Sequence, residues 1–274
     1  MTNETCKLGF IGGGQMAGAL LKGILAAALY RPAEIVVAEP QQSRREFLTR
    51  EFGVTVVGGA ADFPAACPVV VLAVKPQVMG KVLAQYRELL AGDQLLISIA
   101  AGISLSFMEE CLASDTARVI RVMPNTPALV QAGASALAPG RRVESADLEV
   151  ARQLLAAVGS VVVLEEKQLD AVTGLSGSGP AYVFTFLEGL VDAGVKVGLS
   201  REVAWELARQ TIYGSMQLAA ADKAQNPAAL RAMVTSPGGT TIAGLHVLER
   251  GGFRGLLMDA VETAAKRSAE LGRG

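Results

Sequence analysis

The sequence contains very few of the residues that usually carry acid–base and metal chemistry. It has one histidine, His246, and three cysteines, Cys6, Cys67 and Cys111, among 274 residues. The single histidine argues against His-rich metal sites, Ser-His-Asp triads and Cys-His dyads, so we expect no metal site and a chemistry that comes largely from a cofactor. Three scattered cysteines suit a reducing compartment better than a disulfide framework.

The sequence also lacks a strong net charge and a long apolar run. Lys and Arg total 25 against 26 Asp and Glu, so the formal charge is -1 and nothing attracts a polyanion such as nucleic acid. No apolar run reaches the ~20 residues of a membrane span, since Lys22 interrupts Ala19–Tyr30. The first residues show no basic segment followed by a cleavage site. We therefore expect a cytoplasmic enzyme without nucleic-acid or membrane partners.

Short apolar runs alternate with helical stretches in the first part of the chain. Strands are predicted at Leu8–Ile11, Ile35–Ala38, Val69–Val74, Leu95–Ile99, Val119–Val122 and Val161–Leu164, and helices at Gln15–Tyr30, Gln41–Phe52 and Gln77–Leu90. The apolar runs are nearly continuous, which is typical of parallel strands covered by helices on both faces. The pattern predicts an α/β fold that begins with a Rossmann-type doubly wound sheet.

The strand signals stop after Leu164. From Gln168 the chain reads as helices separated by Gly, Pro and Ser, with Ser200 and Asn226 as expected N-caps. We therefore predict an α/β domain at residues 1–164 and an all-helical domain at residues 165–274. The segment Ala181–Val197 is apolar on nearly all faces, so part of the helical surface is expected to lie in a subunit interface.

A glycine-rich turn closes the first predicted strand and opens the first helix. Its Gly12, Gly14 and Ala17 match the pattern G-x-G-x-x-A. The first glycine permits the tight turn, the second lets the backbone approach a pyrophosphate, and the small third residue allows close packing of helix on strand. Free amides at the helix N-terminus then face the phosphates. The alternative is a turn without a ligand, but its place in a β-α pattern predicts a dinucleotide-binding domain.

The sequence leaves the choice between NAD and NADP open. Glu39 ends the second strand, where an acidic side chain can hydrogen-bond the adenine ribose and favour NAD. Ser43, Arg44 and Arg45 follow, and they either meet the 2′-phosphate of NADP or lie on a solvated helix face. The turns after two later strands, at Ala73–Pro76 and Ser98–Gly102, are expected on the nicotinamide side. We interpret Lys75 as a positional residue that acts mostly through its backbone rather than as a catalytic acid.

A second candidate site lies at Thr235–Ile242, which reads TSPGGTTI and precedes the helical spacing of Ala243–Arg250. Its hydroxyls and amides gather around one helix N-terminus, which suits a small carboxylate. The alternative is a plain helix cap. Capping needs only one Ser or Thr, however, and paired glycines add a conformational cost that close approach to a ligand explains.

Four motifs resemble the pyrroline-5-carboxylate reductase family. They are TSPGGTTIAGL at Thr235–Leu245, LSGSGPAY at Leu175–Tyr182, RVMPNT at Arg121–Thr126 and AVKP at Ala73–Pro76. The resemblance runs from Gly9 to about Leu271. It implies reduction of the cyclic imine 1-pyrroline-5-carboxylate to L-proline by NADPH or NADH, the last step of proline biosynthesis. It also implies a homodimer with intertwined helical domains, often assembled further into a decamer.

The resemblance also implies the residues of the site, which joins the nucleotide domain of one subunit to helices of its partner. The Thr241 hydroxyl would approach the ring nitrogen as the catalytic group. The substrate carboxylate would be held by Ser236, Gly238, Gly239, Thr240 and Thr241, with Glu166 near the substrate. The expected cofactor-binding residues are Ile11, Gly12, Gly13, Gly14, Gln15, Met16, Ala38, Glu39, Pro40, Ala73, Val74, Lys75, Pro76, Ala100, Ala101 and Asn125. Ala60 and Met233 depart from the family pattern, which has asparagine at these positions in many or some members.

Two other classes of function compete with this prediction. A related two-domain reductase, such as an imine reductase or a β-hydroxyacid dehydrogenase, would share the layout. The hydroxyacid enzyme, however, should carry a lysine acid on its long helix, and Ala181–Val195 has none. A dinucleotide-sensing protein without turnover would not need the carboxylate site. We expect His246 on a helix surface or in an interface, and Tyr182 in interface packing.

Overall fold

The computed structural model describes residues 6–90, 92–113, 116–221 and 226–272, which form two compact units. The first, here called the sheet unit, runs to Ser178 and includes the chain again from Thr263, and the second, the helical unit, is Gly179–Glu262. The first unit extends beyond Leu164 because the buried Leu169 packs against Ala136 and Ala138 of the sheet. The assignment of residues 165–274 to dimerisation and substrate binding stays a prediction.

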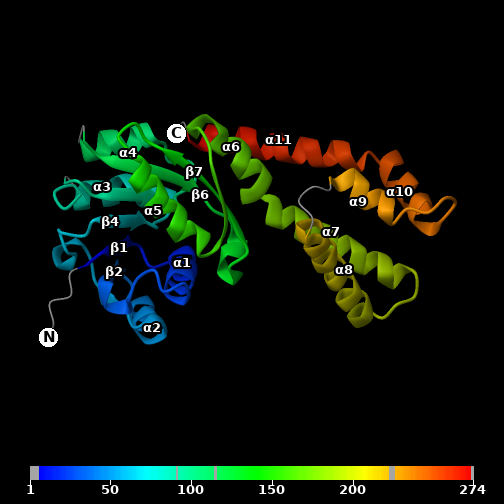
Figure 1. Ribbon diagram of the computed structural model, residues 1–274, viewed down its shortest axis with the longest axis horizontal. Helices are drawn as coiled ribbons and strands as arrows, with labels where there is room; N and C mark the ends of the chain where they lie inside the picture. The colour runs from blue at the N-terminus through cyan, green and yellow to red at the C-terminus, as the bar shows by residue number, and fades with distance from the viewer. Residues whose placement is uncertain (1–5, 91, 114–115, 222–225, 273–274) are drawn as a thin grey trace. The chain divides into compact units, whose positions relative to one another are not determined.

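The sheet unit contains an eight-stranded sheet in the order β3-β2-β1-β4-β5-β6-β7-β8. Figure 1 labels β2, β1 and β4 of this sheet, and β6 and β7. Its strands are β1 (Leu8–Ile11), β2 (Ile35–Ala38), β3 (Thr55–Val57), β4 (Val69–Leu72), β5 (Leu95–Ser98), β6 (Arg118–Met123), β7 (Gly133–Pro139) and β8 (Gly159–Val163). Its helices are α1 (Gln15–Ala26), α2 (Gln42–Phe52), α3 (Met79–Tyr86), α4 (Leu105–Leu112), α5 (Ser145–Ala156) and α6 (Leu169–Val172). This confirms the predicted α/β fold with a Rossmann-type sheet.

Each face of the sheet carries its own hydrophobic core. On β4, Val69 and Val71 join a core with side chains of α1, α2 and α5, whereas Val70 and Leu72 join a core with α3 and α4. Side chains along a strand alternate between faces, so a strand covered on both sides must be apolar throughout. This explains the continuous apolar runs in the sequence.

Two strands, β3 and β7, were not predicted from the sequence. β3 has three residues between glycines, and β7 begins with Gly, Ala and Ser, which have little strand preference. β7 also runs antiparallel to β6, while the other neighbouring pairs in the sheet are parallel. The connection at residues 124–132 is shorter than the ~12 residues of a parallel crossover, which favours the antiparallel return.

The cysteine pattern was predicted to suit a reducing compartment better than a disulfide framework, and this prediction missed one disulfide. A disulfide joins Cys6 and Cys67, which lie in the buried core on the α3–α4 face. Leu8, the first residue of β1, pairs in parallel with Val69, the first residue of β4, and each cysteine lies two residues before its strand. The two cysteines are 61 residues apart in the sequence, so no local pattern predicts that they lie close together.

The helical unit contains α7 (Gly179–Lys196), α8 (Arg201–Ala221), α9 (Pro227–Met233), α10 (Thr240–Arg250) and the first part of α11 (Phe253–Leu271). The expected N-caps are confirmed, because Ser200 accepts from the amide of Val203 and Asn226 from that of Ala229. Within the described residues of the chain, no helix is both long and apolar enough to cross a membrane.

Candidate active site

The glycine-rich turn lies at the carboxyl ends of the central strands. The Gly12 amide donates to the Ala38 carbonyl at 2.8 Å, and the Ala73 amide donates to the Ile11 carbonyl at 2.8 Å. These bonds continue the parallel ladders of β1 with β2 and β4 beyond the strand ends. The turn, Glu39 and the Ala73–Pro76 turn therefore share one edge of the sheet, where ligands bind in open α/β folds.

The shape of this turn fits a dinucleotide pyrophosphate. Gly12 has φ +97°, and a Cβ there would lie 2.6 Å from the Ala73 carbonyl oxygen, so only glycine fits. A Cβ on Gly14 would meet nothing within 4 Å, which leaves open space against the backbone. No side chain caps the N-terminus of α1, whose amides remain available to an anion.

The remaining predicted cofactor residues lie around this edge in different environments. Lys75 is exposed and accepts the Val78 amide through its carbonyl, at the start of a short 3₁₀ turn. Ala100 is buried, with its amide donating to the Ser98 hydroxyl at 3.4 Å, and Ala101 is exposed. Of the others, Ile11 and Ala38 are buried, Met16 is half-buried, and Gln15 and Pro40 are exposed.

Glu39 and Arg44 are bound directly to the glycine turn. Glu39 Oε2 accepts the Gly13 amide at 2.9 Å, and Arg44 donates from Nε to the Gly13 carbonyl at 2.5 Å and from Nη2 to the Gly14 carbonyl at 3.0 Å. The sequence left Arg44 as either a phosphate ligand or a solvated residue, and contact with the turn was missed. No local signal could have found it, because the contact spans 31 residues.

Asn125 uses its side-chain amide inside the protein. Its Oδ1 accepts the Ala134 amide at 2.8 Å, and its Nδ2 donates to the Ser176 carbonyl at 3.0 Å. Ser176 belongs to a π-helical turn, Thr173–Gly177, which overlaps the start of the LSGSGPAY motif. Single π-helical turns occur frequently at functional sites. The Asn125 side chain therefore connects the segment after β6 to this motif. Its role toward the cofactor stays a prediction.

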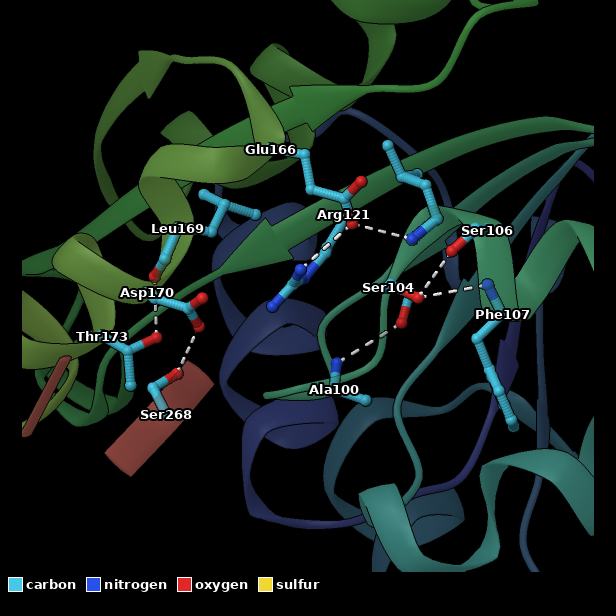
Figure 2. A network of polar contacts seen from close by, with 12 residues as sticks. Ala100, Ser104, Ser106, Phe107, Arg121, Glu166, Leu169, Asp170, Thr173 and Ser268 are labelled. Atoms are coloured by element: carbon cyan, nitrogen blue, oxygen red, sulfur yellow. Dashed lines mark hydrogen bonds and ion pairs between the residues drawn. The ribbon is translucent and has the colours of Figure 1, made fainter. Parts of the chain in front are cut away.

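Glu166 lies in a polar network that the sequence did not reveal (Figure 2). Its Oε1 accepts from Nη1 of Arg121 at 3.0 Å and from the Leu105 amide at the start of α4 at 2.8 Å. Nearby, the Ser268 hydroxyl donates to Asp170 at 2.7 Å. A clue was present, because Arg121 interrupts an apolar strand and a buried guanidinium needs an acidic partner. Glu166 therefore joins β6 to the start of α4 within the sheet unit. Its role toward the substrate stays a prediction.

The predicted carboxylate site lies in the helical unit at the N-terminus of α10. Gly238 has φ +67° with open space at its Cβ position, and Gly239 is the N-cap residue without a side-chain cap. The N-cap position is filled by a residue without a side chain, and Thr241 lies inside the helix, which argues against the plain-cap alternative. His246 is exposed on the same helix, and the Tyr182 hydroxyl donates to the Ala260 carbonyl at 3.4 Å.

Two family models match different parts of the chain. Residues 166–271 match the model described as pyrroline-5-carboxylate reductase dimerisation, and residues 7–102 match that of coenzyme F420-dependent NADP oxidoreductases. The second match contains the glycine turn, Glu39 and Ala73–Pro76. The first contains the uncapped N-terminus of α10.

Known proteins resemble the chain over nearly its full length. The pyrroline-5-carboxylate reductase of Synechocystis is 46% identical over 97% of this chain and 98% of the relative, and that of Arabidopsis thaliana is 44% identical over 98% and 96%. The solved Coxiella burnetii enzyme has a TM-score of 0.92 at 36% identity, covering 97% of this chain and 98% of that one. The Plasmodium falciparum enzyme, solved with NADP bound, has a TM-score of 0.85 at 35% identity, covering 98% and 99%. The chain belongs to the pyrroline-5-carboxylate reductase family.

Proposed function

We propose that this protein reduces 1-pyrroline-5-carboxylate to L-proline with NADPH or NADH, in the final step of proline biosynthesis. The observation that carries the proposal is that this chain, 44% identical to the Arabidopsis thaliana enzyme over 98% of its length, has glycine at the N-cap of both α1 and α10. The start of α1 suits a pyrophosphate, and the start of α10 suits a carboxylate.

The chain's own residues bind and orient the two reactants. The reduced nicotinamide, when bound, supplies the hydride that the imine carbon accepts. Gly12–Met16 hold the pyrophosphate, and the turns at Ala73–Pro76 and Ala100–Ala101 border the nicotinamide. These assignments rest on the shared edge of the sheet described above and on the family resemblance.

At the other site, Ser236 and the amides of Gly238–Thr241 hold the substrate carboxylate, and the Thr241 hydroxyl hydrogen-bonds the ring nitrogen. Glu166 contributes to the surroundings of the substrate. A protonated imine is strongly electrophilic, so positioning replaces a dedicated acid, which fits a chain with one histidine.

The assembly we propose is a cytoplasmic homodimer with intertwined helical domains, able to associate further into a decamer. In it, the nucleotide site of one copy works with α10 of its partner. The dimerisation model matched by residues 166–271 and the exposed apolar side chains of the helical unit support this arrangement.

An assay with the purified protein tests the proposal. We expect oxidation of NADH or NADPH, followed by absorbance, only when 1-pyrroline-5-carboxylate is present, with L-proline as the product. A small β-hydroxyacid tested with the oxidised cofactors serves as the alternative substrate. Turnover of that acid without imine reduction, or dinucleotide binding without any turnover, would contradict the proposal.

A further inference from the structure

The way in which Glu39 is held bears on the choice between NAD and NADP that the sequence leaves open. Its two carboxylate oxygens accept different backbone amides, Oε2 that of Gly13 and Oε1 that of Gln41, each at 2.9 Å. The residue is only 8% exposed. The carboxylate is therefore fixed against the glycine turn and does not swing freely on the surface.

Packing around Gly13 reinforces this position. A Cβ on Gly13 would lie 2.5 Å from Leu48 Cδ1 and 3.2 Å from Glu39 Oε2. The turn, the carboxylate and α2 thus pack together without room for a side chain between them. Moving Glu39 away would break both hydrogen bonds and would leave the buried Gly13 amide without its partner.

A carboxylate in this place discriminates between ribose and ribose phosphate. A carboxylate has about four lone-pair sites, and the two backbone amides occupy two of them. The other two sites can accept hydrogen bonds from two ribose hydroxyls. A 2′-phosphate would instead bring a charge of about -1.5 to -2 beside the carboxylate, at a partly desolvated position. The fixed acid therefore favours the cofactor that has a free 2′-hydroxyl.

The two nearby arginines are engaged with the backbone. Arg44 bonds the Gly13 and Gly14 carbonyls, and its guanidinium lies 4.5 Å from the centroid of the Phe47 ring. Arg45 donates to the carbonyls of Glu39 at 3.1 Å and Pro40 at 2.7 Å. Both side chains hold the turn and the end of β2 in place. In this arrangement they support the carboxylate rather than present an open phosphate site.

We propose that Glu39 makes this enzyme select NADH over NADPH, and that Arg44 is a positioning residue for the glycine turn. The inference rests on the proposed function for the presence of a dinucleotide site, and it narrows that function to one cofactor.

Equilibrium binding to the purified full-length protein tests this inference without turnover. Calorimetric titration with NAD⁺ and NADP⁺ should give at least about tenfold tighter binding of NAD⁺. Glu39→Gln removes the charge at similar size and should shift the ratio of the two dissociation constants at least about tenfold toward NADP⁺. Glu46→Gln, which removes an exposed carboxylate on α2, is the matched control and should leave the ratio unchanged.

Arg44→Ala distinguishes two roles of Arg44, namely holding the glycine turn in position and binding the 2′-phosphate of NADP⁺. If Arg44 only holds the turn, both dissociation constants rise by the same factor, whereas a phosphate ligand would weaken NADP⁺ alone and contradict this role. If Glu39→Gln unfolds, Glu39→Ser, checked by thermal unfolding, replaces it. Tighter NADP⁺ binding by the parent, or an unchanged ratio in the Glu39 variant, overturns the inference and leaves imine reduction intact. Failure of both dinucleotides to bind overturns the proposed function as well.

Discussion

The sheet unit buries far more of its apolar side chains than the helical unit does. The sheet unit buries many of its large side chains almost completely on the two faces of the sheet, including Phe10, Leu20 and Leu72. In the described part of the helical unit, the buried hydrophobic side chains are Val191, Ala204 and Ala208. Phe184, Leu256 and Met258 are 64%, 64% and 69% exposed there.

The difference in burial indicates that the sheet unit is stabilised by its own core, whereas the helical unit needs contacts from outside the unit. A doubly wound sheet covers its own core, because helices pack on both faces. A few helices with apolar residues on several faces have no such cover within the unit and remain marginal alone. In the proposed dimer, the second copy supplies the missing layer.

The largest effect is expected from a charge placed in the exposed apolar surface of the helical unit. Met258→Glu places a carboxylate where we expect the partner copy, and burying an unpaired charge costs several kcal/mol. We predict a monomer by light scattering after gel filtration and a loss of reductase activity of at least about 100-fold. Val130→Glu, on an exposed residue of the sheet unit, is the control. A fully active dimer from Met258→Glu would contradict the account.

Equal truncations in the two units should give different kinds of instability. Leu20→Ala opens a cavity in the closed core and should lower the free energy of unfolding by about 2–5 kcal/mol, with the same shift in melting temperature at every protein concentration. Leu256→Ala should give a shift that grows as the protein is diluted, because its contacts lie between copies. Thermal unfolding across a concentration series measures both, and matching behaviour of the two variants would remove the distinction.

The two hydroxyls at the start of α10 should affect different kinetic constants. Thr241→Ala should lower kcat about 10-fold to 100-fold, since a hydrogen bond in a desolvated site is worth about 1–3 kcal/mol, whereas Thr241→Ser should retain most activity. Ser236→Ala should mainly raise KM for 1-pyrroline-5-carboxylate. Steady-state kinetics, with melting temperatures as the check on folding, tests this. Unchanged kinetics with lowered stability would point to a structural role.

The smallest expected effect concerns pH and the closed sheet unit. Hydrogen bonds from the Lys7 ammonium and from the backbone amide and guanidinium of Arg31 lower the pKa of Glu34 from 4.5 to about 2. A carboxyl whose pKa falls on folding stabilises the protein above its unfolded pKa and loses that contribution as the pH falls. Glu34→Gln should therefore melt below the parent above pH 4.5, with a gap that narrows toward pH 2.

The control for this pH prediction is Glu51→Gln on α2, an exposed carboxylate whose loss should shift the melting temperature little at any pH. A gap between Glu34→Gln and the parent that stays constant from pH 7 to pH 3 would show that the ionised Glu34 is not its source.

Local patterns in the sequence were sufficient for much of this fold. Continuous apolar strands, the glycine turn and the caps at Ser200 and Asn226 depend on residues close in the chain, and these were predicted correctly. β7 was missed because its Gly-Ala-Ser start has little strand preference of its own, and the sheet around it decides its conformation.

Contacts between distant segments account for what the sequence did not show. Arg44 reaches back to Gly13, Asn125 reaches forward to Ser176, and Cys6 meets Cys67 through the register of two parallel strands. Each of these side chains is compatible with several roles when the sequence is considered alone. Its role becomes clear only when the structure shows which distant residue it contacts. The site residues themselves stay predictions, carried by motifs whose order along the chain matches the family.

Mixing two inactive variants tests the central claim most directly, namely that one copy's nucleotide site works with its partner's α10. Gly14→Asp should fold, since Gly14 has φ -65° and open space at its Cβ, but it should repel the pyrophosphate. Combined by subunit exchange with Thr241→Ala, it leaves one intact site in each mixed dimer. We predict recovery of about a quarter of the parent activity in an equal mixture. Activity that stays at the average of the two variants, although mixed dimers are present by native mass spectrometry, would contradict the account.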